Sequence, residues 1–347
     1  MKGLRVFVSL FSMIIIWSVT ATAQAQDPGI RVDINVGAVF PKGEAESVGT
    51  AGGTPILLKQ KSAPMMNIGV GYVPDNRWGF QVRGSHFATS AKEVVGVLDP
   101  PNKLMLWGVD PDIELFCSSR AICVNGKTSY GASDTKSRTR LDFLATRTWA
   151  SDEGDKRRYL SAGLSYLGYS RQQAISGAWQ KTIFDKPSGV AIDERLEMRT
   201  DSLVRLKAVG LTVAGEVETC LNGSWRLDLR GQGTKFLSGS ANRNGKLTPR
   251  KWGTLSNGLG GFSYEWPLEP LADKANANSA ELDASAALRF VTGRHELGFG
   301  VGWTKLTGLP TAHYVVPAGR AAVFGAWQTG TVSESHVRLF GQYVVRF

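Results

Sequence analysis

The sequence predicts an all-β fold, a transmembrane antiparallel β-barrel, and three observations carry this prediction. Residues 336–347 alternate apolar and polar side chains and end on Phe347. A strand places successive side chains on opposite faces, so this segment has one face suited to lipid and one suited to a wet interior. Similar alternating segments recur along the chain. The connections between them are short and long in turn, which is how outer-membrane barrels are wired.

The C-terminal segment carries the sharpest pattern. Its apolar face ends in Tyr343, Val345 and Phe347, whereas Arg338 and Arg346 lie on the opposite face. Such an aromatic end is typical of the closing strand of outer-membrane barrels. We therefore expect Tyr343, Val345 and Phe347 to act as the membrane-assembly signal that the barrel-assembly machinery binds.

The N-terminal segment predicts export. Lys2 and Arg5 precede an apolar stretch over 6–19, and the small-residue run 21–25 supplies an A-x-A-like cleavage site. This pattern predicts a secretory signal peptide over 1–26, with an N-terminal anchor helix as the alternative. We expect residues 27–347 to form a single barrel domain, because no later apolar run is long enough for a spanning helix. The predicted location is the outer membrane of a Gram-negative bacterium.

Composition supports a β fold and excludes some partners. Forty glycines and ten tryptophans with only three cysteines favour β structure without a disulfide scaffold. The formal net charge is +10, but the positive residues are spread over the predicted strands rather than clustered. This spread does not indicate nucleic-acid binding, and anionic lipopolysaccharide, beside outer-membrane lipid, is the simpler external partner.

Alternation predicts ten strands, an even number with both ends of the chain on the periplasmic side. In chain order they cover 30–40, 66–72, 78–85, 140–146, 160–166, 203–215, 225–230, 282–290, 297–303 and 336–347. Short polar segments that we interpret as periplasmic turns lie at 74–77, 151–157, 218–224 and 292–295. Long connections, interpreted as extracellular loops, lie at 41–63, 88–137, 172–200, 237–279 and 307–334.

Three details qualify the strand prediction. Extra strands within 253–266 and 314–327 would give twelve strands instead of ten. Segment 203–215 changes its apolar parity midway, which predicts a bulge. Arg147 falls on the lipid-facing parity of its strand, where it is tolerable if it reaches the headgroup layer beside a turn.

The inward parity of these strands is rich in ionic side chains. The expected channel-lining residues are Arg31, Asp33, Arg83, Arg140, Asp142, Arg205, Lys207, Arg226, Asp228, Arg230, Asp283, Arg289 and Arg338. A dry apolar core would not accept so many charges. Two functions fit such an interior. It could be an aqueous passage whose arginines attract small anions, or a plug of ion pairs inside a platform that acts through its long loops. On the residues alone the two readings stay open.

Several segments resemble the Legionella-type major outer membrane protein family. The hairpin over 69–87 is similar to that family's second-to-third strand hairpin, and 141–149 with 159–167 is similar to its central hairpin. Residues 225–240 and the C-terminal strand also fit. The resemblance implies a pore-forming protein, so it favours a porin-like channel for passive diffusion of small hydrophilic, preferentially anionic solutes. A non-conducting platform or adhesion protein is the alternative.

Catalytic and metal sites are not predicted. The four histidines are far apart in sequence, and none belongs to an H-E-x-x-H pair. We therefore expect no enzyme activity, no cofactor and no metal. Cys117 and Cys123 lie in the longest predicted loop, where an oxidising compartment favours a disulfide, with two free thiols as the alternative. Cys220 has no evident partner. The oligomeric state is not predicted.

Overall fold

The fold is described from a computed structural model of the chain. It describes residues 29–43, 45–91, 94–99, 104–107, 121–151, 156–185, 190–255, 260–266, 268–276, 278–317 and 325–347. The predicted signal peptide lies outside these residues. Within the described ranges no helix has the length and apolar character that crossing a membrane requires.

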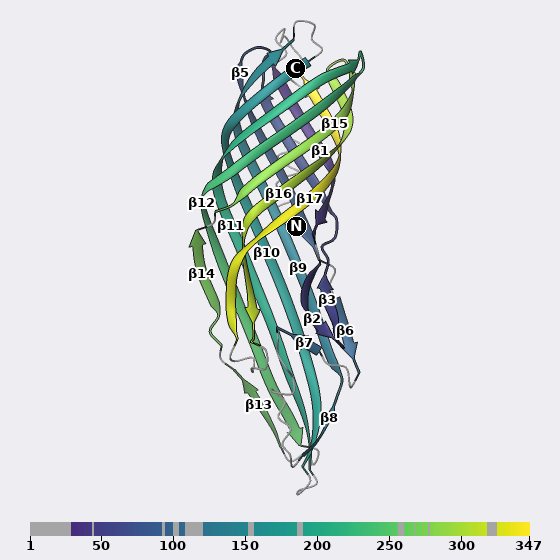
Figure 1. Ribbon diagram of the computed structural model, residues 1–347, viewed down its shortest axis with the longest axis vertical. Coiled ribbons are helices and arrows are strands. Elements are labelled where there is room, and N and C mark those ends of the chain that lie inside the picture. The colour runs from purple at the N-terminus through teal and green to yellow at the C-terminus, as the bar shows by residue number, and fades with distance from the viewer. Residues whose placement is uncertain are drawn as a thin grey trace.

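Ten strands of the described chain form a closed antiparallel ring (Figure 1). Going round the ring they are β1 (Ile30–Lys42), β4 (Ala63–Tyr72), β5 (Trp78–Ser90), β9 (Thr128–Ala150), β10 (Lys156–Asp185), β11 (Ala191–Asn222), β12 (Trp225–Leu255), β15 (Ala280–Thr292), β16 (His295–Val315) and β17 (Ala326–Arg346). Closure is made by β1 and β17, which pair from Arg31↔Arg346 to Lys42↔Ser335. The predicted ten-stranded transmembrane barrel is confirmed.

The lipid-facing belt is visible in the exposure of outward side chains. On β9 the outward residues from Leu141 to Trp149 are mainly apolar, and Phe143 is 55% exposed. Beyond Leu141 the outward positions of β9 turn to serine, threonine and glycine. The apolar stretch has the length that a tilted strand needs to cross a bilayer. The turn end of the barrel, which holds the short hairpins and residue 347, therefore lies on one side of the lipid, and the loop end on the other.

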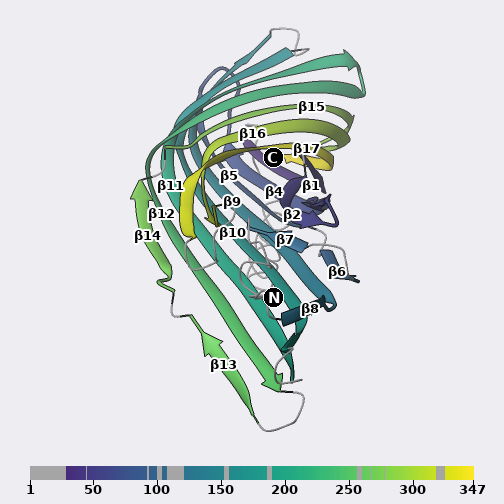
Figure 2. The same cartoon turned by 60° about the horizontal axis from the view of Figure 1, so that its bottom comes forward.

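Four neighbouring strands continue far past the lipid belt. β9, β10, β11 and β12 have 23, 30, 32 and 31 residues, about two to three times what a bilayer requires. They form a long curved sheet at the loop end (Figure 2). The prediction of a loop over 172–200 is wrong there, because β10 and β11 stay paired as far as Phe184↔Ala191. Likewise β12 runs through 237–255, and β16 and β17 enter the predicted loop 307–334 from both ends.

The extensions were predicted to be loops because their outward-facing side chains are polar. On β11 beyond the belt, Leu196, Met198 and Leu206 point inward and are buried, whereas Arg195 and Arg205 point outward. Water replaces lipid around this part of the barrel, so the apolar face is now the inner one. The strand still alternates, but its apolar side chains now lie on the inner face. This exchange of faces accounts for the parity change within 203–215. The register shift nearest to it adds a residue in the neighbouring strand β12, between Phe236 and Ser238.

The remaining strands are not part of the hydrogen-bonded ring of ten. Strands β6 (Val94–Leu98), β8 (Ala121–Asn125), β13 (Gly261–Glu265) and β14 (Leu271–Asn276) pair with the extensions of β9, β10 and β12. Strands β2 (Glu46–Ala51), β3 (Thr54–Leu58) and β7 (Leu104–Leu106) form a separate small sheet. Its buried side chains pack with Trp179 and Met198 in an apolar core at the loop end. The twelve-strand alternative placed extra strands within 253–266 and 314–327. The first segment contains the end of β12 and the short strand β13 that pairs with it, and the second contains the ends of β16 and β17.

Candidate functional site

The inner face of the barrel is the candidate site, and it carries most of the residues predicted to line it. Period-two alternation brings these side chains inward from every part of the ring. Eleven of the predicted lining residues have partners or neighbours inside the barrel, namely Arg31, Asp33, Arg83, Arg140, Asp142, Arg226, Asp228, Arg230, Asp283, Arg289 and Arg338. Arg205 and Lys207 do not join them. Their side chains are exposed on the outer face of β11, because the inward positions beside them belong to Val204, Leu206 and Ala208.

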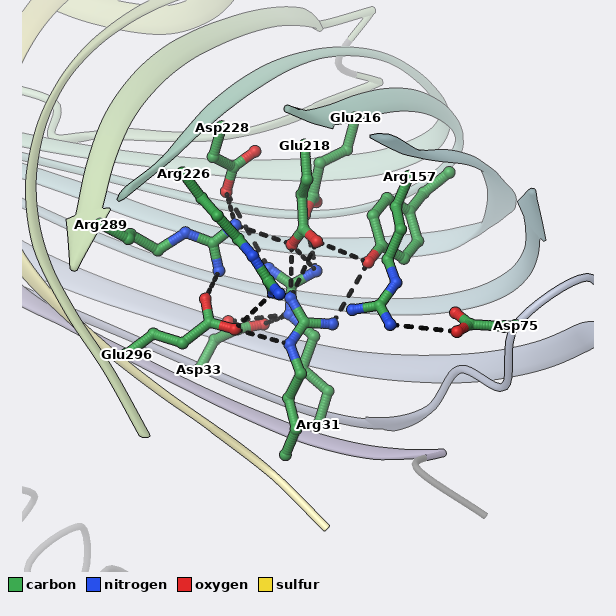
Figure 3. Close-up of polar contacts among 12 residues, drawn as sticks. Arg31, Asp33, Asp75, Arg157, Glu216, Glu218, Arg226, Asp228, Arg289 and Glu296 are labelled. Atoms are coloured by element: carbon green, nitrogen blue, oxygen red, sulfur yellow. Dashed lines mark hydrogen bonds and ion pairs between the residues drawn. The ribbon is translucent and has the colours of Figure 1, made fainter. Parts of the chain in front are cut away.

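A network of ion pairs fills the turn end of the bore; we call it the inner network. Glu218 lies at its centre, with carboxylate oxygens 2.7 Å from Arg289 Nη2, 2.7 Å from Arg346 Nη2 and 3.0 Å from Arg31 Nη1. Tyr159 donates its hydroxyl to Glu218 at 2.9 Å. Glu296 contacts Arg346 Nε at 2.8 Å. Figure 3 shows the side chains of Arg31, Glu218, Arg289 and Glu296 converging from different walls of the barrel.

The inner network resembles a metal site only in its carboxylates. Oxygens of Glu216, Glu218 and Asp228 lie within 4.8 Å of one another. Arg31 contacts all three, at 2.7, 3.0 and 4.0 Å. Arg289 contacts Glu218 at 2.7 Å and Asp228 at 3.4 Å. The guanidinium groups thus supply the positive charge that these buried carboxylates need, and the donor set does not fit a metal ion.

The two glutamates of β11 were missed by the sequence reasoning, which interpreted Glu218 as the start of a turn. β11 continues to Asn222, so Glu216 and Glu218 keep the inward parity of Thr212 and Ala214. A signal for them was present. Val213 and Val217 have the lipid-facing parity, and a strand carried past Gly215 would have placed both glutamates inside. Glu281 was missed in the same way, one residue before the predicted strand at 282–290.

A second group of ion pairs, the middle network, lies farther toward the loop end. Arg140 Nε is 2.7 Å from Asp142 Oδ1, and Arg140 Nη1 is 2.5 Å from Glu281 Oε1. Arg338 Nη2 is 2.8 Å from Asp283 Oδ2. The glycines Gly298, Gly300 and Gly302 of β16 leave room for this packing. A Cβ at Gly302 would lie 2.6 Å from Arg338 Nη2, and one at Gly300 would lie 2.5 Å from the Phe340 ring.

Between the two networks lies a central cavity of about 100 Å³, space for roughly three water molecules. Arg83, Arg230 and Arg338 line it. Arg83 pairs with Glu216 at 3.1 Å and Arg338 with Asp283. Arg230 contacts the amide of Gln232 and has no ion pair with any carboxylate of the described chain. The cavity is therefore polar, and the guanidinium of Arg230 is exposed to it without a direct ion pair in the described chain.

A third group, the outer network, lies beyond the lipid belt at the loop end. Arg171 Nε donates to both oxygens of Asp134 at 3.1 Å, and Lys136 Nζ is 2.7 Å from Glu334 Oε1. Burial raises the pKa of Asp134 in spite of the positive charges of Arg171 and Lys136. Burial also acts to raise the pKa of Glu334. The hydrogen bond from His336 and the charge of Lys136 outweigh it and hold that pKa at about 2.

The other predicted residues are placed as follows. Cys117 and the side chain of Cys123 lie outside the described residues, so their disulfide stays a prediction. Cys220 is a free thiol at the turn end, with Sγ 2.8 Å from the Asn222 carbonyl oxygen. Arg147 lies over the Trp149 ring, 5.9 Å from its centroid.

The C-terminal residues take part in barrel closure. Tyr343 pairs with Ile34 and Val345 with Val32 across the closing strands. The backbone N–H of Phe347 donates to the Ile30 carbonyl oxygen at 2.9 Å. These contacts place the predicted membrane-assembly signal on the seam where the ring closes.

Comparison with known proteins gives no family. No family model and no curated protein matches the chain. Among solved structures it is similar to the outer membrane protease OmpT of Escherichia coli, with a TM-score of 0.40 and 10% identity over 94% of this chain and 100% of that one. It is also similar to the outer membrane protein OprG of Pseudomonas aeruginosa (TM-score 0.28, 9% identity, 92% and 97% covered). The toluene transporter TodX of Pseudomonas putida gives a TM-score of 0.25 with 10% identity over 91% and 89%. The fold and the site rest on the contacts described above.

Proposed function

We propose that the protein is a narrow channel in the outer membrane of a Gram-negative bacterium, used by small hydrophilic solutes and preferring small anions. The observation that supports it is the central cavity, where Arg230 has no carboxylate partner within the described chain. A half-buried positive group that lines a polar cavity attracts anions, since arginine-lined pores favour them. The resemblance to the Legionella-type major outer membrane protein family remains part of this proposal.

The bore limits what can pass. A barrel of about eight strands is just filled by its own side chains, whereas sixteen or more leave a wide channel. Ten strands lie close to the filled end of this range. The inner and middle networks cross the bore on either side of the central cavity, so a solute must displace arginine side chains as it moves. We therefore expect small conductance steps and a solute no larger than a few non-hydrogen atoms.

The channel proposal is tested by recording from the purified protein in planar bilayers under a salt gradient. The expected result is discrete, small currents with a reversal potential on the anion side. Arg230→Ser and Arg83→Ser should each move the reversal potential toward cations, because they remove positive charge from the cavity wall. Arg199→Ser is the matched control, since that arginine is 63% exposed on the outer face of β11. Equal shifts in all three variants would contradict the role given to Arg230.

A second candidate is a closed barrel that serves as a platform for its outer sheet. The pairing of the inner network favours it, because every carboxylate there contacts arginine and the bore holds only a small cavity. Silent bilayers, with protein shown to be folded by its heat-modifiable gel mobility, would support this candidate and overturn the channel.

We further propose that lipopolysaccharide surrounds the barrel at the loop end of the lipid belt. Arg205, Lys207, Lys235 and Lys305 are exposed on the outer face, near the loop-end edge of the lipid belt. Cations at this height suit the phosphate groups of that lipid. For insertion we propose recognition of the C-terminal strand by the barrel-assembly machinery. Replacing Phe347 by Ser should lower the yield of folded protein in the membrane fraction.

A further inference from the structure

The loop end of the barrel holds two adjoining cavities beyond the central cavity; together we call them the outer chamber. One has a volume of about 400 Å³ and lies against the outer network. The other, of about 440 Å³, lies between β2, β10, β11 and the ends of β16 and β17. Both are lined by Glu46 and His313, whose exposed side chains connect the chamber with solvent. Each volume is within the usual range of small-molecule sites.

The buried charged groups of the outer chamber are paired with each other, whereas Lys42 and Lys59, which line the first cavity with exposed side chains, have no ion pair among the described residues. Asp134 receives two hydrogen bonds from Arg171 and one, at 3.0 Å, from Gln60 Nε2. Glu334 contacts Lys136 and accepts the Tyr169 hydroxyl at 3.0 Å. A charged ligand inside the chamber would have to compete with these buried pairs, and the two exposed lysines are solvated and would add little. The chamber therefore favours a ligand without net charge.

Four buried polar atoms of the chamber, in contrast, lack partners. Thr89 is 2% exposed and His336 is 4% exposed. Thr89 Oγ1, His336 Nδ1 and Gln60 Oε1 line the first cavity and have no hydrogen-bond partner among the described residues. Trp107 is 9% exposed and lines the second cavity, and its Nε1 also has no hydrogen-bond partner among the described residues. A buried polar atom without a partner is costly, and here four such atoms meet in one solvent-connected space.

The second cavity adds an aromatic wall. Trp107, Tyr314 and Trp327 line it, and the Tyr314 and Trp327 rings meet edge to face with centroids 5.5 Å apart. Such rings offer apolar faces together with polar edges. A ligand seated here can thus bury C–H groups against the rings while its polar groups reach the unpartnered atoms.

From this arrangement we propose that the outer chamber binds a neutral, hydroxyl-rich molecule the size of a mono- or disaccharide. A hydroxyl group both donates and accepts, so one kind of group satisfies the acceptor Gln60 Oε1, the donor Trp107 Nε1 and the Thr89 hydroxyl. A neutral ligand can bind without breaking the ion pairs of the chamber. The chamber adjoins the central cavity, since His336 lines both, but binding to it is measured without conduction.

The test is equilibrium binding to the full chain in a detergent without a sugar headgroup, followed by calorimetry and tryptophan fluorescence. The probes are glucose, maltose, sucrose and trehalose, with gluconate as the anionic comparison. We expect saturable binding of at least one neutral sugar, tighter than gluconate, with a fluorescence change from the aromatic wall. Absence of saturable binding by all four, or tighter binding of gluconate, would overturn the proposal.

Matched variants locate the binding. Thr89→Val removes one unpartnered polar atom with little change of shape, and Trp107→Phe removes another together with part of the aromatic wall. Each should weaken the sugar by at least roughly three- to tenfold. Thr135→Val is the control, because Thr135 is exposed on the outer face of β9 and its loss should leave affinity unchanged. Heat-modifiable gel mobility verifies that each variant is folded. Equal weakening by Thr135→Val, or no weakening by both chamber variants, would contradict the assignment.

Discussion

Neutralising Glu218 tests how dry the inside of the barrel is. Glu218 is 2% exposed and contacts Arg31, Arg289 and Arg346, while Tyr159 donates to it. Glu218→Gln keeps the shape but removes the charge that three guanidinium groups share. In a low-dielectric interior, removing one partner of a buried ion pair costs about 3–5 kcal/mol. The Gln oxygen can still accept a hydrogen bond, so we expect a loss near the lower value, about 3 kcal/mol.

The loss is measured by urea unfolding of the protein folded into phospholipid vesicles, with tryptophan fluorescence as the signal. Glu197→Gln is the matched control. Glu197 pairs with Arg195 at 2.7 Å on the outer face, where both side chains are about 40% exposed, and such pairs contribute about 1 kcal/mol or less. If Glu218→Gln loses no more than Glu197→Gln, water screens the inner network. Such a result would contradict the tight pairing of the inner network.

Two further predictions follow from the outer network and the glycines of β16. The pKa of Glu334 is lowered from 4.5 to about 2, so its stabilisation is complete above pH 4.5 and is lost as pH falls toward 2. Urea unfolding of wild type against Glu334→Gln should show a difference on the order of 3 kcal/mol at pH 7 that shrinks on acidification; a constant difference would contradict the shift. Gly300→Ala should lower the free energy of unfolding by about 1–3 kcal/mol, because its Cβ would meet Phe340, while Gly231→Ala, whose Cβ meets no atom within 4 Å, should not.

The networks could be only half predicted from the sequence, and particular residues show why. Arg31, Asp142 and Arg289 lie on strands whose outward faces are apolar, so parity alone turns them inward. Glu216 and Glu218 also have the inward parity, but the sequence pattern predicts that their strand ends at residue 215. Their role as partners of Arg31 and Arg289 depends on strands that are far apart in sequence and meet only across the bore. No local pattern contains that information.

Arg205 and Lys207 show the opposite error. Their strand alternates without interruption, yet outside the lipid the apolar side chains turn toward the core that Phe236 and Leu306 share with Leu206. The rule that polar residues face inward holds only where lipid surrounds the barrel. Parity gives two faces, and the surrounding medium decides which is apolar.

The ring of ten antiparallel strands could be predicted from the sequence, because period-two alternation and the spacing of the turns are local properties of the backbone. Three features became known only from the folded chain: how far the strands rise above the lipid, which carboxylate contacts which arginine, and where polar atoms of the outer chamber lack partners. These features arise from side chains that approach one another through ring closure and strand stagger. Their energies depend on neighbours that alternation does not specify.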